Sequence, residues 1–309
     1  MAESIFIFVG SLFLVIRGST MATKHATRLA QSFHISRYVI GFIVVALISI
    51  LPETMIAVNS ALAGMPEFGL GTLFGSNVAD LTLIFAILIF HIGRGVRVST
   101  KVLSSTEFFP LFILLPLIFG MNGYYGRIEG LFLIVAGSYF YYKIFKGGVS
   151  ESPTQHTAVK AHRSLFLLIF SVLLLLVGSH FTVTSASSLA LALGISPVLI
   201  GMLIVGLGTT MPGLFFSLKS VEREEDSLAV GDLLGTVLAD ATIVVGILAT
   251  ISPFSFPAKI VYITGGFMFL GAMMLINFMH TNRKISVKEG LILTLLWITY
   301  VIVEFTLSS

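Results

Sequence analysis

Residues 71–82 read GTLFGSNVADLT, and residues 231–242 read GDLLGTVLADAT, 160 positions further along the chain. Glycine, alanine, aspartate and threonine coincide at this offset: Gly71 with Gly231, Gly75 with Gly235, Ala79-Asp80 with Ala239-Asp240, and Thr82 with Thr242. Apolar helices share a small alphabet, so leucine or isoleucine matches alone would be unremarkable. Repeated glycine and aspartate positions at one fixed offset instead indicate an internal duplication.

The same offset continues upstream of these two stretches without a gap. The further matches are Gly18-Ser19 with Gly178-Ser179, Ile35-Ser36 with Ile195-Ser196, Ile40-Gly41 with Ile200-Gly201, and Pro52 with Pro212. We therefore predict a first repeat over 1–145 with its central motif at about 41–82, and a second over 164–309 with its motif at about 201–242. The stretch 146–163, which contains glycine, proline and scattered serine and threonine, is predicted to be a linker.

Composition places the repeats in a membrane. Of the 309 residues, 56% are hydrophobic and only 11% are charged, whereas soluble domains carry about 25% charged residues. The net charge of +3 would suggest nucleic acid as a partner in a soluble protein, but here the basic residues flank apolar runs, so the predicted partner is the lipid bilayer. The chain has no cysteine, which excludes disulfides and thiolate metal sites.

Apolar windows long enough for a bilayer predict an all-α integral membrane protein of about ten transmembrane helices. The predicted spans are 4–31, 36–62, 68–90, 102–120, 128–145, 164–192, 196–218, 228–251, 257–280 and 287–306. Each repeat then holds five spans, an odd number, so the second repeat enters the membrane inverted relative to the first. Inverted repeats with unusual residues at mid-membrane are typical of secondary transporters.

The distribution of charge predicts the orientation. If the amino terminus is outside, all of the 18 basic residues except Arg127 and Lys259 fall on the cytoplasmic side, including Arg17 after the first apolar stretch. The positive-inside rule then predicts that both termini are outside and that the linker is cytoplasmic, in a cell membrane.

A proline interrupts an apolar run in both the second and the seventh span, at Pro52 and Pro212. Proline removes a backbone donor and clashes with the preceding turn, so we expect broken helices at both positions. A simple kink is the alternative. Broken helices at this depth occur where freed backbone groups line a cavity or bind an ion.

Three carboxylates, those of Glu53, Asp80 and Asp240, lie within apolar spans that contain no lysine or arginine near them. An acid near the bilayer centre costs about 2.5–3.5 kcal/mol, so a bound cation, a proton or a buried base has to offset this cost. Hydroxyl and carbonyl oxygens nearby favour a hard cation such as calcium or sodium over zinc or copper. A protonated carboxyl group that is hydrogen-bonded to a neighbouring helix is the alternative for any single acid.

These motifs resemble the alpha repeats of the calcium/cation antiporter superfamily, the sodium/calcium exchangers, in which each repeat reads approximately G-T-S-L-P-E and then G-S-N-hydrophobic-x-(N/D). The resemblance covers nearly the whole chain. It implies ion binding between spans 2, 3, 7 and 8, with Glu53 as a calcium-binding carboxylate. The other ion-site positions that it implies are Ser49, Thr209 and Thr210 around the prolines, and Ser76, Asn77, Asp80, Thr236 and Asp240 on spans 3 and 8.

The chain also departs from the family pattern. Gly213 stands where the second repeat usually has its glutamate, and Val237 stands where it has asparagine. Asp80 is acidic where many relatives have asparagine, so we expect three acids to remain and Asp80 to replace the missing charge. The predicted function is exchange of Ca²⁺ for Na⁺ by alternating access. Proton-coupled calcium exchange and a cation-binding protein that no longer transports are the alternatives.

Two other polar residues are predicted to lie outside the ion site. Asp232 is predicted to be interfacial rather than a ligand, and His180 is predicted to be a hydrogen-bonded core residue rather than a proton relay. The chain carries no metalloprotease, nucleophile-elbow or phosphate-loop motif, so neither an enzyme nor a bound cofactor is expected.

Overall fold

The computed structural model describes residues 2–30, 45–99, 103, 108–148, 161–281 and 283–308. The first repeat contributes α1 (Ala2–Ala30), α3 (Ala46–Ser49), α4 (Leu51–Leu62), α5 (Pro66–Ala79), the π-helical turn η2 (Asp80–Ile84), α6 (Phe85–Ile92), β1 (Val96–Arg97), α8 (Phe109–Gly120), β2 (Tyr124–Tyr125) and α9 (Arg127–Gly148). The second contributes α10 (Ala161–Leu193), α11 (Pro197–Ile200), η3 (Gly201–Val205), α12 (Gly206–Glu222), α13 (Asp226–Ala239), η4 (Asp240–Val244), α14 (Val245–Ile251), β3 (Phe254–Ser255), η5 (Ile260–Gly265), α15 (Gly266–His280), β4 (Lys284–Ile285) and α16 (Val287–Ser308).

The helices have the length and composition of membrane spans. Within the described ranges, eight helices are long and apolar enough to cross a bilayer, and Ala46–Leu62 and Phe109–Gly120 are two shorter apolar helices. Each of the ten predicted spans therefore corresponds to a helical segment. Residues 36–44 of the second span and residues 102 and 104–107 of the fourth lie outside the described ranges. The prediction of an all-α membrane protein is confirmed.

The internal duplication is visible in the backbone. Helices α5 and α13 have the same length, each continues into a five-residue π-helical turn, and their bounds differ by 160 positions. The turn before each helix uses a left-handed residue at the same offset, Gly64 with φ of 73° and Glu224 with φ of 60°. Glycine adopts this conformation without the steric cost that Glu224 carries.

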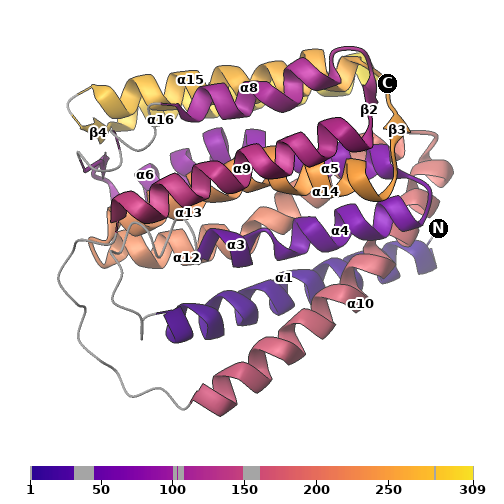
Figure 1. Cartoon of the computed structure of the whole chain (residues 1–309), viewed down its shortest axis with the longest axis horizontal. Helices are drawn as coiled ribbons and strands as arrows, with labels where there is room; N and C mark the ends of the chain where they lie inside the picture. Colours follow the sequence, from indigo (N-terminus) through magenta and orange to yellow (C-terminus); the bar gives the residue numbers. More distant parts are fainter. Residues whose placement is uncertain are drawn as a thin grey trace.

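The two copies run in opposite directions through the bundle. β1 follows α6 and pairs antiparallel with β4, whereas β3 follows α14 and pairs antiparallel with β2. These two small sheets lie at opposite ends of the bundle, as Figure 1 shows. The α5–α6 and α13–α14 rods therefore end on opposite sides.

An ion pair fastens the end of α6 to the start of α13. Arg94 donates to both carboxylate oxygens of Asp226, at 2.7 and 2.8 Å, and the backbone N–H of Arg97 donates to the same group at 2.8 Å. A bidentate contact of this kind is the strongest form of a charged hydrogen bond. It holds the second repeat's helix start at the end of the bundle that carries β1 and β4.

The acid-bearing helices lie in the middle of the bundle. In Figure 1, α1 and α10 cross on one side, α8, α15 and α16 lie on the other, and α3–α5 and α12–α14 run between them. The outer helices expose large apolar side chains such as Phe6, Phe166 and Ile302, which is the surface expected against lipid. Arg17, assigned above to a cytoplasmic loop, instead lies midway along α1, with its guanidinium 6.0 Å from the centre of the Phe13 ring.

Candidate functional site

A break in the second span positions Glu53. α3 ends at Ser49 and α4 begins at Leu51, with Ile50 between them at ψ of −6° and Pro52 in the first turn of α4. Proline fits the start of a helix because its missing N–H has no intrahelical acceptor there. Glu53 therefore stands in the amino-terminal turn of α4, where the helix dipole favours negative charge, and its side chain is buried, with 1% exposed.

The expected break at Pro212 is absent. Pro212 lies inside α12, which continues from Gly206 to Glu222, and the irregularity of this span is the π-helical turn η3 upstream. The hydroxyls of Thr209 and Thr210 each donate to a backbone carbonyl three residues earlier, both at 2.9 Å. The accepting carbonyls are those of Gly206 and Leu207, more than one turn before Pro212, and the helix continues through the proline to Glu222.

Asp80 and Asp240 occupy equivalent places at the first residues of η2 and η4. π-Helical turns inside α-helices are rare, and those that occur are often found at functional sites. Both side chains are buried, and neither carboxylate oxygen of Asp240 has a hydrogen-bond partner. A buried, unpartnered carboxylate is costly unless a cation or a proton neutralises it.

The three predicted acids lie close enough for their charges to interact. Glu53 and Asp80 repel each other, and each of them also repels Asp240. The Thr209 hydroxyl lies against the Glu53 carboxylate, whose Oε2 atom has no partner. Among the described residues, no basic side chain acts on any of these three carboxylates.

A fourth acid joins this group, so the interfacial interpretation of Asp232 is wrong. Its side chain is fully buried in α13, with 0% exposed, and its charge acts on both Glu53 and Asp80. The Ser49 hydroxyl donates to Oδ1 of Asp232 at 2.9 Å, and the Ser217 hydroxyl donates to Oδ2 at 3.4 Å. The spacing of Asp232, Thr236 and Asp240 by four residues places them along one stripe of the helix, which is the signal that could have identified it.

The remaining predicted residues are also buried. Ser76 donates to the Leu73 carbonyl at 3.0 Å, and Thr236 lies one turn before Asp240. Asn77 points its amide nitrogen to the Met268 sulfur in α15, at 3.5 Å, and its oxygen has no partner. In the described part of the chain, no three histidine, aspartate or glutamate side chains are placed to hold one metal ion by themselves. A cation here would need hydroxyl, amide or carbonyl oxygens among its ligands.

Two side chains outside this group also differ from the sequence analysis: Glu304, which it did not single out, and His180, which it placed in the core. Glu304 is a further buried acid, in α16, which accepts a 2.5 Å hydrogen bond from Thr264; its place in an apolar run is the signal that could have found it. His180 is exposed on α10 with its ring 5.5 Å from that of Phe181, so the core interpretation is wrong.

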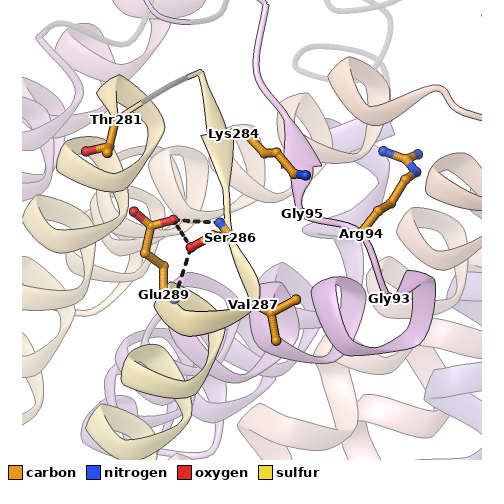
Figure 2. Close-up of a pocket in the computed structure, with 8 residues that line it drawn as sticks. All are labelled: Gly93, Arg94, Gly95, Thr281, Lys284, Ser286, Val287 and Glu289. Carbon is orange, nitrogen blue, oxygen red and sulfur yellow. Dashed lines mark hydrogen bonds between the residues drawn. The ribbon is translucent and has the colours of Figure 1, made fainter.

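The pocket drawn in Figure 2 is separate from the buried acids. It has a volume of about 260 Å³ and lies where the α6–β1 and β4–α16 connections meet, lined by Arg94, Lys284 and Glu289 among others. Two of its charged groups are already engaged, Arg94 with Asp226 and Glu289 with Ser286. The two connections that meet here are joined by the antiparallel pairing of β1 with β4.

Comparison with known proteins agrees with this architecture. A 317-residue alignment covers 97% of this chain and 98% of a putative antiporter, CaxA, from Alkalimonas amylolytica, at 26% identity. The sodium/calcium exchanger MaX1 from Methanosarcina acetivorans is 21% identical over 345 residues, which cover 97% of each chain. The solved sodium-calcium exchanger NCX_Mj superimposes with a TM-score of 0.72 over 96% of both chains at 23% identity, which establishes a shared fold.

The most direct assignment comes from the family as a whole. The sequence model of the sodium/calcium exchanger protein family matches residues 3–146 and 163–306, which together make up nearly the entire chain. The unmatched stretch between them falls in the predicted linker. This chain belongs to the sodium/calcium exchanger protein family.

Proposed function

We propose that this protein is a secondary antiporter that exchanges Ca²⁺ for Na⁺ through one mid-membrane site. The observation that carries the proposal is the group of mutually repelling, buried carboxylates, contributed by both halves and without a basic partner in the described structure. Membership of the exchanger family and the relative named as a sodium/calcium exchanger support the choice of ions. Carboxylate and hydroxyl oxygens suit hard cations.

In the proposed site, Glu53, Asp80 and Asp240 supply the negative charge. Hydroxyl, amide or backbone oxygens complete the coordination; these come from Ser49, Ser76, Asn77, Thr209, Thr210 and Thr236. Binding of either one divalent cation or several monovalent cations lowers the repulsion between the acids. Ca²⁺ and Na⁺ therefore compete for the same carboxylates, because either of them relieves the same repulsion. This competition is the physical basis of exchange.

The proposed transport is by alternating access. The acid-bearing rods α5–α6 and α13–α14 run in opposite directions, so each side of the membrane would reach the site through an equivalent set of helices. We further propose that both termini are outside and that the linker is cytoplasmic, on the basis of the positive-inside rule.

The function is tested with purified protein in liposomes. We expect an outward Na⁺ gradient to drive uptake of radioactive calcium, and uptake to collapse when the Na⁺ gradient is dissipated. Uptake that follows a pH gradient and ignores Na⁺ would instead assign proton-coupled exchange. Binding of Ca²⁺ by the purified protein without any flux would assign a cation-binding protein that does not transport. Protein-free liposomes are the control for leakage.

A further inference from the structure

Gly213 leaves space beside Asp232 in the second repeat. It corresponds to Glu53 of the first repeat but carries no side chain. A Cβ atom added to Gly213 would lie 3.7 Å from Oδ2 of Asp232 and would meet no other neighbouring group within 4 Å. The Asp232 carboxylate therefore lies beside the space that a side chain at position 213 would enter.

The two repeats differ at this position in a complementary way. At the 160-residue offset, Asp232 corresponds to Thr72, which is buried and donates to the Phe68 carbonyl in α5. The first repeat thus has a carboxylate at 53 and a hydroxyl at 72, whereas the second has glycine at 213 and a carboxylate at 232. Each repeat keeps one acid in this pair of positions, but on different helices.

Hydrogen bonds orient Asp232 toward the site. Ser49, itself one of the predicted ligand positions, belongs to the first repeat and donates to Oδ1, while Ser217 of α12 approaches Oδ2. Two hydroxyl donors do not neutralise a fully buried carboxylate, and no basic side chain is among its partners in the described structure. Its charge reaches Glu53 and Asp80.

Unpartnered atoms in the same group indicate that a ligand is required. Oε2 of Glu53 and both carboxylate oxygens of Asp240 are buried without a hydrogen-bond partner. Buried polar atoms are nearly always satisfied in native proteins, and carboxylate oxygens can be satisfied by a cation. The site therefore presents a free acceptor atom on Glu53, within electrostatic reach of the Asp232 carboxylate that Ser49 holds in place.

We propose that Asp232 is a cation ligand, which supplies from α13 the carboxylate that the second repeat lacks at Gly213. Asp232 lies about 9 Å along the axis from the start of α13 and about 12 Å before Asp240. The proposal rests on the proposed function of this same site, and it places the compensating charge at Asp232 instead of Asp80.

The test measures Ca²⁺ binding to purified full-length protein by equilibrium dialysis with radioactive calcium. We expect Asp232→Asn to weaken the Ca²⁺ affinity by about tenfold or more, because ligand charge sets much of the affinity of calcium sites. Asparagine keeps the size and can still accept the Ser49 hydrogen bond, so folding should be preserved. The matched control is Glu304→Gln, which removes a buried, hydroxyl-bonded carboxylate outside the group and should leave the affinity unchanged.

A second variant tests the exchange of positions directly. Adding Gly213→Glu to Asp232→Asn should restore most of the lost affinity, because the new carboxylate enters the space beside residue 232. Gly213→Glu alone should not strengthen binding, because it places two like charges together. If Asp232→Asn does not fold, the double variant alone decides: parental affinity supports the proposal, and a folded double variant without binding overturns it.

The outcomes separate this proposal from the function on which it rests. Unchanged Ca²⁺ affinity in Asp232→Asn, with a parent protein that binds and transports Ca²⁺, would overturn the role of Asp232 and leave the antiporter intact. A parent protein that binds neither Ca²⁺ nor Na⁺ would overturn the proposed function, and this proposal with it.

Discussion

At the scale of single residues, Glu53 occupies the best-defined position in the site. A helix break places it in the amino-terminal turn of α4, and burial leaves one of its carboxylate oxygens without a partner. The charge is therefore stabilised by the helix dipole but not balanced. This combination suits a group that binds and releases a cation, because an acid already paired with a basic group would gain little from binding one.

The role of Glu53 is tested by Glu53→Gln. We expect this variant to lose Na⁺-driven calcium uptake in liposomes. Without ions it should be at least as stable to heat as the parent protein, because an unbalanced buried charge has been removed. The measurements are flux and the apparent melting temperature in detergent. If Glu53→Gln keeps the parental flux, the transported cation binds elsewhere. If the Glu304→Gln control also loses flux, the loss is not specific to Glu53 and reflects a general need for buried acids in folding.

At the scale of elements, the close approach of α5 to η3 decides how the two halves meet. A Cβ atom at Gly75 would lie 2.7 Å from Cα and 2.8 Å from the carbonyl carbon of Met202, and one at Gly206 would lie 2.9 Å from the Ser76 nitrogen. Gly75 on α5 and Gly206 at the start of α12, directly after η3, let the backbones touch, as small residues do between membrane helices. Gly71, one turn before Gly75, makes a similar approach, since a Cβ atom added there would lie 2.8 Å from Cγ1 of Val198.

We predict that Gly75→Ala forces α5 away from η3 and destabilises the protein by about 1–3 kcal/mol, the usual cost of overpacking. It should also impair calcium flux, because η3 leads directly into the turn that carries Thr209 and Thr210. The matched control is Gly266→Ala in α15, where φ is −61° and an added Cβ meets nothing within 4 Å. This control should be stabilised by about 0.5–1 kcal/mol. Equal melting temperatures for the two variants would contradict the packing argument.

At the scale of the whole molecule, the two ends of the bundle differ in the number of basic residues that the structure describes. The end with β1 and β4 carries Arg94, Arg97, Lys219, Arg223, Arg283, Lys284 and Lys288, whereas Arg127 and Lys259 adjoin β2 and β3 at the other end. Both chain ends are marked at the β2–β3 end in Figure 1. If the positive-inside rule applies, that end faces the outside of the cell.

The orientation can be tested by single-cysteine labelling, since the natural chain contains no cysteine. Cysteine at Ser152, in the linker outside the described residues, should react in intact cells only with a membrane-permeant thiol reagent. Cysteine at the exposed Ser255 of β3 should react with an impermeant reagent as well. The reverse pattern would invert the topology, and equal labelling of both sites would contradict a single orientation.

The membrane class, the ten spans, the repeat and three of the buried acids can be predicted from the sequence, because hydropathy and positions matched at one offset can be read without knowledge of the fold. By contrast, the break expected at Pro212 is absent. A proline in an apolar run can break a helix or lie within one, and the sequence pattern is the same in both cases.

The four-residue spacing of Asp232, Thr236 and Asp240 is visible in the sequence, but it does not show that Asp232 is the fourth acid of the group. Asp232 lies six residues from a helix start, so its sequence position resembles that of an interfacial residue. What makes it part of the site is a hydroxyl from the other repeat, Ser49, and the space left by Gly213 on a neighbouring helix. These groups are 183 and 19 positions away in the chain. Burial and electrostatic coupling depend on which helices meet across the bundle, and a pattern read along one helix contains no record of its neighbours.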